Sequence, residues 1–260
     1  PKHLSATGPA WGTPGVAGGD PVRVALLRAL GERRVDTLVL SHRDSDHTGG
    51  AASLAQALPV ATLVSSLEAG HPLRARGPPP PPPARAPRGG GGGGVEVQEP
   101  PPPPVDFEFL HPGAATLAAA TPATRANTLS CVLRVQAASG ASALLTGDIE
   151  AAQEAALVRQ AGERLRSTVL WVPHHGSRTS STADFIAAVA PRVAVVQAAH
   201  RSRFGHPAPA VMARYAAAGV PVIATPACGA WRWRSTAAAG VCTRDQGRRY
   251  WHHPGHPGHE

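Results

Sequence analysis

Cysteine, aromatic residues and charge are all scarce in this sequence, and the shortages exclude whole classes of protein. The three cysteines, Cys131, Cys228 and Cys242, are odd in number and widely spaced, which excludes a disulfide scaffold and a zinc module built on a Cys-x-x-Cys pair. No apolar run approaches the roughly 18–20 residues that cross a bilayer, and no signal-peptide pattern opens the chain. We therefore expect the 260 residues to form a soluble piece, of one large or two small domains, that can belong to a larger membrane protein.

Lysine is almost absent, yet the chain is basic. It carries 25 basic and 17 acidic residues, for a formal net charge of +8, and Lys2 is the only lysine. A positive surface favours polyanions such as nucleic acid. Arginine- and alanine-rich usage also accompanies GC-rich coding sequence, so the charge by itself leaves DNA binding and a compositional bias equally open.

Proline and glycine, 28 of each, are in excess, and a large share of the excess lies in one window. Residues 77–104 hold 12 prolines and 7 glycines, a composition that cannot bury enough apolar surface to fold. We interpret this window as a disordered insertion in a surface loop, and the alternative is a docking site for a proline-binding module. Residues 1–76 and 105–253 are then two parts of a single domain, and residues 254–260 are a flexible tail.

Outside that window, short β-rich runs alternate with helical patterns. Strands are predicted at residues 35–40, 60–65, 105–110, 129–135, 143–145, 168–172, 193–197, 220–224 and 231–234. Helices are predicted at residues 49–58, 150–160, 182–189 and 209–218. This interleaving of strands and helices indicates an α/β layered fold.

The densest group of chemically active residues follows the first predicted strand. Residues 41–50, SHRDSDHTGG, contain four potential metal ligands: His42, Asp44, Asp46 and His47. A loop at the carboxyl end of a strand is where α/β folds place ligands. Because two carboxylates this close repel each other unless a cation compensates them, a metal site is favoured over a solvated loop that caps a helix.

Three later strand ends carry further candidates. Asp148 ends LLTGD, His174 and His175 stand in VPHHGS, and His206 lies in FGHP. Each by itself is typical of a turn or a packed loop, but four such endings in one chain favour a shared site. Adjacent side chains of an extended segment point to opposite sides, so we expect at most one of the paired histidines to reach a given metal.

The segment HRDSDHTGG resembles the HxHxDH signature of the metallo-β-lactamase superfamily, in an HxDxDH variant. The order of LLTGD, VPHHGS and FGHP is similar to the C-terminal metallo-β-lactamase-like domain of the ComEC/Rec-type DNA-internalisation proteins of competent bacteria. The similarity runs from about residue 28 to residue 253 and skips the Pro/Gly window. It implies an α/β fold of the metallo-β-lactamase type, an αββα sandwich with a binuclear metal site between its two sheets.

The resemblance also implies a role for each candidate residue. The metal ligands it implies are His42 and Asp44 for the first ion, Asp46 and His47 for the second, Asp148 as the bridge, and His175 and His206. Asp46 and His174 are the catalytic candidates, the first orienting the hydroxide nucleophile and the second contacting substrate. Asp44 replaces a more usual histidine, and this extra oxygen tilts the preference of the two divalent ions from Zn²⁺ toward Mn²⁺ or Mg²⁺ without deciding it.

Two features depart from the family pattern. The histidine of the third superfamily motif has His111 as its candidate, at a position typical of a structural turn, while Asn127 and Ser130 stand nearer the equivalent strand. The DVGQGD-like hairpin and the following strand of related domains have no counterpart before His42. From the sequence we therefore expect the first sheet to lack its N-terminal strands, and the membrane-spanning part of such proteins to be absent.

The function implied is that of a metal-dependent phosphodiesterase or nuclease acting on single-stranded DNA during uptake. Such a domain would lie at the outer face of the bacterial inner membrane, joined to the membrane channel portion of the same parent protein. Arg232, Arg234, Arg248 and Arg249 alternate with tryptophan and tyrosine and are candidates for holding the strand; the alternative is an ordinary packed edge strand with solvated arginines. Two other functions stay open, a small-molecule metallo-hydrolase and a DNA-binding or scaffold module with an incomplete metal site.

Overall fold

The structure is a computed structural model that describes residues 4–6, 21–75 and 105–246. The chain divides into two compact units, Pro1–Pro103 and Pro104–Glu260. The Pro/Gly window at 77–104 and the tail at 254–260 lie outside the described residues. The interpretations of these two segments stay predictions, and so does the assignment of the flanking parts to a single domain.

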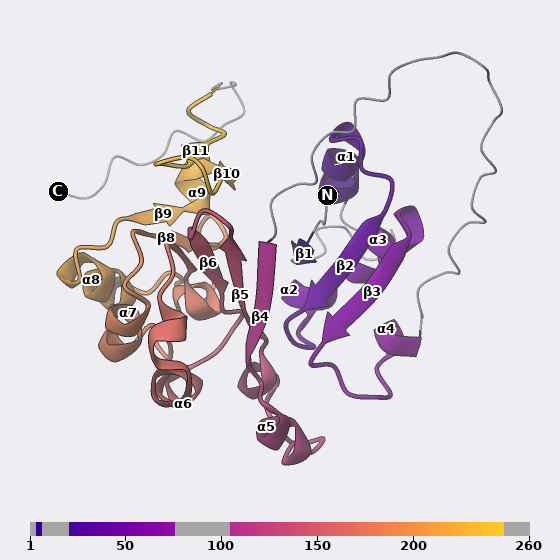
Figure 1. The fold of residues 1–260 in the computed structure, drawn as a ribbon, viewed down its shortest axis with the longest axis horizontal. Coiled ribbons are helices and arrows are strands. Elements are labelled where there is room, and N and C mark those ends of the chain that lie inside the picture. The colour runs from indigo at the N-terminus through magenta and orange to yellow at the C-terminus, as the bar shows by residue number, and fades with distance from the viewer. Residues whose placement is uncertain (1–3, 7–20, 76–104, 247–260) are drawn as a thin grey trace. The chain divides into compact units, whose positions relative to one another are not determined.

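The first unit is built on a three-stranded parallel sheet (Figure 1). Its elements are β1 (Leu4–Ala6), α1 (Pro21–Ala29), β2 (Val35–Leu40), α2 (Ser45–Thr48), α3 (Ala51–Ala57), β3 (Val60–Ser65) and α4 (Pro72–Ala75), with strand order β1-β2-β3. Leu38, Val39 and Leu40 are buried in succession, as in a strand covered on both faces. Leu54 of α3 and Val60 of β3 join the same core, so the β2–α3–β3 crossover holds the loop that follows β2.

The second unit is built on a six-stranded mixed sheet. Its strands, in spatial order, are β4 (Val105–His111), β5 (Val132–Ala137), β6 (Ser142–Leu145), β7 (Val169–Trp171), β8 (Val193–Val196) and β9 (Val222–Ala224). Strands β4 to β6 pair antiparallel, and β6 to β9 pair parallel. The helices are α5 (Ala114–Ala118), α6 (Ala151–Ala161), α7 (Ala183–Val189), α8 (Pro209–Ala217) and α9 (Thr225–Cys228), with 3-10 turns η1 (Ala126–Leu129), η2 (Gly162–Leu165) and η3 (Pro173–Gly176). A ribbon of β10 (Trp231–Arg232) and β11 (Val241–Cys242) follows.

The core of the second unit lies between this sheet and helices α6, α7 and α8 (Figure 1). Leu144, Leu170 and Ala194 pair across β6, β7 and β8 and therefore point to one face of the sheet. They pack in one buried cluster with Phe185 of α7 and Val211 of α8. The loops at the carboxyl ends of the parallel strands are thus supported by a closely packed core. These strand ends are where α/β sheets place their ligands.

The α/β fold predicted from the sequence is confirmed, and β2 and β3 occupy the predicted residues. Strand β1 and helix α1 form in the lead-in, where no element was predicted. Strand β5 begins at Val132, later than predicted, because Ala126–Leu129 form the 3-10 turn η1. None of the helices in the described ranges has the length and apolar character required to cross a bilayer.

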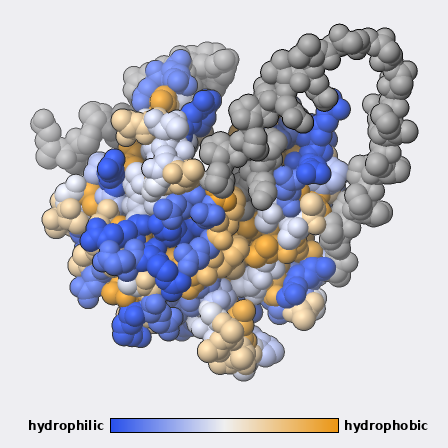
Figure 2. Space-filling model, in the orientation of Figure 1, coloured by the Kyte–Doolittle hydropathy of each residue, from blue (hydrophilic) through white to orange (hydrophobic). Residues whose placement is uncertain are grey.

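Hydrophilic and hydrophobic residues are interspersed on the face of the second unit seen in Figure 2. Two ion pairs lie at the surface of this unit, Arg164 with Glu108 and Arg166 with Glu163, each at 2.6 Å. Such exposed pairs contribute little to the free energy of unfolding, because water screens them and both side chains lose rotamer freedom.

A buried carboxylate, by contrast, links three helices of the second unit. Glu154 on α6 is fully buried and accepts hydrogen bonds from the backbone N–H groups of Ser181 and Thr182, which lead into α7. Arg214 on α8 donates to the carbonyl oxygens of Ser180 and Ser181 at 2.9 and 3.1 Å. Burial raises the pKa of Glu154, and the hydrogen bonds from Thr182 and Ser181 oppose that rise.

We expect Glu154→Ala to lower the free energy of unfolding by about 2–4 kcal/mol, because two buried N–H donors lose their acceptor. Urea unfolding followed by circular dichroism measures the change. Glu163→Ala is the matched control, since this glutamate is exposed and its loss should change the free energy by less than about 0.5 kcal/mol. Equal effects of the two substitutions would contradict the role given to Glu154.

One disulfide, between Cys228 and Cys242, was not predicted from the sequence. It joins α9 to β11 across a separation of 14 residues, while Cys131 is buried and takes no part in this bond. The disulfide therefore fastens the C-terminal ribbon rather than the main core.

Reduction of this disulfide should destabilise the ribbon by about 3 kcal/mol, the value for a loop of this length. Thermal unfolding with and without dithiothreitol, followed by tryptophan fluorescence, reports the change because Trp231 and Trp233 lie in and beside β10. The reductant should have no effect on a Cys228→Ser, Cys242→Ser double variant. An unchanged Tm of the parent chain in dithiothreitol would show that the bond does not form or does not stabilise.

Candidate metal centre

The first group of candidate ligands lies in the loop between β2 and α3. The Thr48 hydroxyl donates to the carbonyl oxygens of Asp44 and Arg43, at 3.1 and 3.3 Å, and so fastens the short helix α2 to the residues before it. Ser66, just beyond β3, donates from its hydroxyl to the Ser41 carbonyl oxygen at 2.6 Å. The loop is therefore tied to both ends of the crossover.

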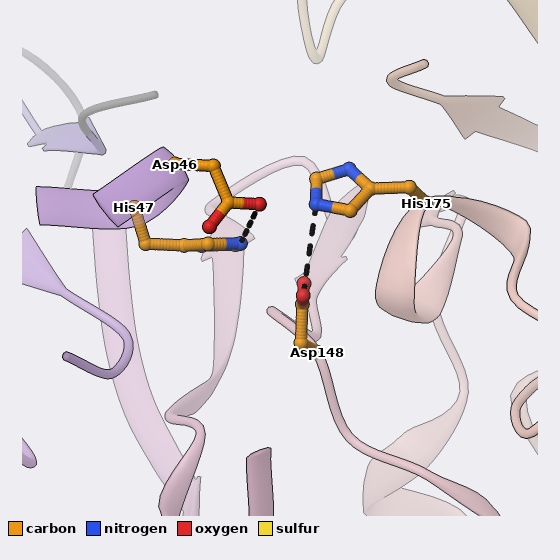
Figure 3. A group of neighbouring side chains, drawn as sticks. All are labelled: Asp46, His47, Asp148 and His175. Carbon is orange, nitrogen blue, oxygen red and sulfur yellow. Dashed lines mark ion pairs between the residues drawn. The ribbon is translucent and has the colours of Figure 1, made fainter. Parts of the chain in front are cut away.

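Ser41 orients two of the candidate histidines. Its Oγ lies 3.1 Å from Nδ1 of His42 and 3.0 Å from Nδ1 of His47, and the two ring centroids are 4.1 Å apart. A hydroxyl oxygen has two lone pairs, so it can accept from Nδ1–H of both rings, a tautomer in which both Nε2 atoms carry lone pairs. Nε2 of His42 is 3.5 Å from Oδ2 of Asp44. Figure 3 shows the second pair, in which Nε2 of His47 is 3.7 Å from Oδ2 of Asp46.

Each of these pairs sets an imidazole nitrogen beside a carboxylate oxygen. In the tautomer in which Ser41 accepts from both rings, both atoms are acceptors, and they repel unless a proton or a cation lies between them. Separations of 3.5 and 3.7 Å are also close to those of two ligands on one cation, whose bonds are about 2.0–2.2 Å long. The chemistry and the spacing of this group fit a divalent metal.

The second group begins with Asp148, in the loop after β6. Its side chain is only 6% exposed, and its backbone N–H donates to Oγ of Ser130 at 2.8 Å. Thr146, two residues earlier, donates from its hydroxyl to the Trp171 carbonyl oxygen on the neighbouring strand, at 2.8 Å. Both contacts fix the backbone that carries the carboxylate.

His174 and His175 lie in the turn η3, and both adopt a left-handed backbone, with φ of 50° and 53°. This region is sparsely populated by residues other than glycine, and its use marks a conformation imposed by the surroundings. The alternation expected of an extended segment does not hold here. Nε2 of His174 is 3.8 Å and Nε2 of His175 is 3.6 Å from the same Oδ2 of Asp148, so both rings face one carboxylate.

The tautomer of His175 follows from its partner. Nδ1 lies 2.8 Å from the carbonyl oxygen of Gln197, and a carbonyl can only accept, so Nδ1 carries the proton and Nε2 presents its lone pair toward Asp148 (Figure 3). Metal-binding histidines commonly donate their other N–H in this way. His174 differs, since Thr179 and the Glu150 carboxylate both lie 3.4 Å from its Nδ1.

His206 lies beside this pair, with its ring centroid 5.9 Å from that of His174. Burial lowers the pKa of His206. The neighbouring rings of His174 and His175 lower this pKa further, and the charge of Asp148 opposes the shift. The neutral ring, the form that binds metals, is therefore favoured. Nδ1 of His206 is buried and has no hydrogen-bond partner among the described residues, an arrangement that costs free energy unless a ligand satisfies the atom.

Gly176 holds the loops of His175 and His206 together. Its carbonyl oxygen accepts from the Ala208 N–H at 2.8 Å, and a Cβ added at Gly176 would lie 2.7 Å from Cβ of Pro207. With φ at +79°, the position is also one that side chains rarely adopt.

We expect Gly176→Ala to weaken the binding of a divalent metal by about 10- to 100-fold, because the clash displaces the two histidine loops. Isothermal titration with Mn²⁺ and with Zn²⁺ measures it. Gly219→Ala is the control: its φ of +68° carries a similar backbone penalty, but nothing lies within 4 Å of the added Cβ. Equal metal affinities of the two variants would show that the packing of Gly176 on Pro207 does not hold the ligands.

His111 is the last residue of strand β4 rather than part of a turn, and its contacts are structural. It is buried, Nε2 donates to the Thr128 carbonyl oxygen at 2.8 Å, and burial lowers its pKa. Ser130 contacts the candidate site through the backbone of Asp148, whereas Asn127 lies in η1.

Arg232 and Arg234 are exposed, on β10 and just after it. The tryptophans that alternate with them pack on one another: Trp231 and Trp233 stack with centroids 6.5 Å apart, and Trp231 meets Trp171 edge-on at 6.2 Å. Arg248 and Arg249 lie outside the described residues. A role of these four arginines in binding nucleic acid stays a prediction.

The structure thus brings the candidate ligands together in two groups, one in each unit. The groups are His42, Asp44, Asp46 and His47 in the first unit, and Asp148, His174, His175 and His206 in the second. No role was predicted from the sequence for Ser41 or for the Gln197 carbonyl, which contact the Nδ1 atoms of His42, His47 and His175. A serine directly before His42 is a sequence feature from which a contact to the ring could have been predicted. A contact from a backbone carbonyl has no such feature, because every residue carries one.

The fold and the two ligand groups define a class of protein. The model of the metallo-β-lactamase superfamily matches residues 7–200, and the chain belongs to this superfamily, whose fold is that of metal-dependent hydrolases that typically bind divalent metals such as zinc. The chain is 37% identical to Competence protein ComA of Neisseria gonorrhoeae over 80% of this chain and 26% of that protein. It is 30% identical to ComE operon protein 3 of Bacillus subtilis, over 73% of this chain and 23% of the relative.

Recombination protein 2 of Haemophilus influenzae is a further relative, 30% identical over 81% of this chain and 23% of its own length. The resemblance to the ComEC/Rec-type proteins, drawn from the motifs, is confirmed by these relatives. The chain spans about a quarter of the length of the curated relatives it matches.

Proposed function

We propose that this chain is a metal-dependent phosphodiesterase that cleaves DNA during uptake, as the hydrolase part of a larger ComEC-type protein with a membrane channel. The observation that carries the proposal is the set of imidazole–carboxylate pairs, of which His175 with Asp148 is the clearest, because its tautomer directs a lone pair toward the carboxylate. One relative is named a competence protein and another a recombination protein, which supports DNA as the substrate.

In this proposal the candidate ligands hold two divalent ions, Mn²⁺ or Zn²⁺ with Mg²⁺ as a further candidate. The superfamily match at residues 7–200 extends over the first group and over Asp148, His174 and His175 of the second, which supports a common role. His42 and Asp44 would hold one ion, Asp46 and His47 the other. Asp148 would bridge them, with His175 and His206 completing the set.

Two divalent ions supply Lewis acidity when bound: they lower the pKa of a water molecule and offset the negative charge on a phosphodiester. Hydrolysis then joins the water oxygen to phosphorus, breaks the bond to the leaving oxygen and transfers a proton to that oxygen. Asp46, half-buried beside His47, is the group that would orient the attacking water. His174, held on its Nδ1 side by Glu150 and Thr179, would contact a phosphate oxygen.

Exposed arginines would hold the DNA backbone without reading its sequence, because guanidinium groups bind phosphate oxygens that every nucleotide shares. Arg232 and Arg234 are the described candidates, and Arg248 and Arg249 belong to the same prediction. The net charge of +8 then serves as an electrostatic attraction for the strand.

We expect Asp148→Asn to lower the rate of DNA cleavage by about 100-fold or more, because the substitution removes the charge of the proposed bridging ligand. The assay follows a fluorescently labelled single strand in the presence of Mn²⁺, Zn²⁺ or Mg²⁺, with a chelator as the blank. Asp184→Asn is the matched control, an exposed aspartate in the same unit whose loss should leave the rate unchanged.

The same assay separates the alternatives. Cleavage that persists in an Asp46→Ala, His47→Ala double variant would show that another site, or a contaminant, cuts the DNA. Binding of DNA without cleavage by any of the three metals would favour the scaffold function. Turnover of a thioester or lactam without cleavage of DNA would favour a small-molecule hydrolase.

A further inference from the structure

Phe204 is the most exposed of the large hydrophobic side chains in the described part of the chain, at 68%. It lies in the segment between β8 and α8, two residues before His206. A phenylalanine left in water forgoes the free energy that its burial would contribute. An aromatic ring exposed beside a candidate metal ligand therefore marks a surface that can receive a partner.

The backbone around Phe204 is fixed although its ring is exposed. The Phe204 N–H donates to Oγ of Ser202 at 3.3 Å, and the Gly205 N–H donates to the Ser202 carbonyl oxygen at 2.9 Å. Gly205 closes this turn with φ at +68°. A ring on such a turn is presented in a preset position, so a ligand that stacks on it orders little else.

The ring has a cationic and an aromatic neighbour. The Arg203 guanidinium lies 4.7 Å from the ring centroid, and the His206 ring stacks at 6.0 Å with 26° between the planes. Arg201 and Arg203 are both exposed on this segment. An aromatic face among arginines is the combination by which proteins bind single-stranded nucleic acid, with bases on the ring and phosphates on the cations.

We infer that Phe204 stacks an unpaired nucleobase of the substrate next to the scissile phosphate, with Arg203 moving from the ring to a flanking phosphate. The inference rests on the proposed function, since it names the form of DNA that this site accepts. The Phe204 ring lies next to the His206 ring, with centroids 6.0 Å apart, and the His206 ring lies next to that of His174, with centroids 5.9 Å apart. A base on Phe204 therefore carries its phosphodiester toward the candidate ligands.

This arrangement predicts a preference for single strands without a preference for sequence. Bases of a duplex already stack on their neighbours, so reaching Phe204 requires a base to leave the stack. Every base has a π-face, so the ring does not distinguish one from another.

The test compares Phe204→Ala and Phe204→Trp with the parent chain. We expect Phe204→Ala to raise KM and Kd for single-stranded DNA by about 5- to 100-fold with little change in kcat, the effect of one lost stacking contact. Phe204→Trp should restore both constants. Phe107→Ala, which removes another exposed phenylalanine of the same unit, is the control and should leave them unchanged.

Single strands with one abasic nucleotide, placed in turn at each position around the cut, make the test specific. At one position the abasic strand should weaken binding to the parent chain as much as Phe204→Ala does, and should weaken binding to the variant no further. Equal Kd values of Phe204→Ala and the parent chain on intact strands would overturn the inference. The inference would also be overturned if Phe204→Ala raised Kd by the same factor, relative to the parent chain, for every abasic strand. The variant would then weaken binding without losing a contact to one particular base, as a displaced His206 would.

The readouts also separate this inference from the proposed function. If the parent chain cleaves DNA and Phe204→Ala has the same KM and Kd, the stacking inference is wrong and the proposed phosphodiesterase function is supported. If the parent chain never cleaves DNA, the proposed function fails, and fluorescence anisotropy with the same abasic strands still decides whether Phe204 holds a base.

Discussion

Repulsion between acceptor groups is the constraint on which the rest of this structure depends. Carboxylates and imidazole nitrogens lie within 3.5–3.8 Å of one another in both units, and two such acceptors repel unless a proton or a cation lies between them. The surrounding contacts hold these groups in place. Ser41 fixes two rings through Nδ1, the Gln197 carbonyl fixes a third, and Ser130 holds the backbone of Asp148. The positions of the candidate ligands therefore depend on the residues that hydrogen-bond to them.

The sequence predicts strands well where β-branched and apolar residues are concentrated in a short segment. Strands β2 and β3 stand where segments rich in valine, leucine and threonine predicted them, and the two strands pair parallel. Prediction fails where hydrogen bonds at an element's end decide its length. Strand β9 starts at Val222 rather than residue 220, because the Val220 N–H donates to the Tyr215 carbonyl oxygen at the end of α8. Strand β1 has only three residues and leaves too short a pattern to detect.

The candidate ligands could be found by residue type and position, since each follows a strand. Their directions could not. An extended VPHHGS segment would separate the two histidines, but the left-handed turn brings both toward Asp148. Nothing local in the sequence demands φ values of 50° and 53° at two consecutive histidines. The glycine that follows them, Gly176, packs against Pro207, a contact between segments about thirty residues apart. Tertiary packing, rather than propensity, sets the geometry of this site.

The buried carboxylate of Glu154 has a consequence for the dynamics of the second unit. Glu154 on α6 accepts a hydrogen bond from the Ser181 N–H just before α7. From α8, Arg214 donates to the Ser180 carbonyl oxygen and the Tyr215 hydroxyl donates to Oγ of Ser181. Detachment of α7 would leave polar groups of both α6 and α8 without their partners, and detachment of α6 or α8 would do the same to the start of α7. The three should therefore open and close as one cooperative unit. Ligand loops that begin or end at α6, α7 and α8 are thereby shielded from the local unfolding of any single helix.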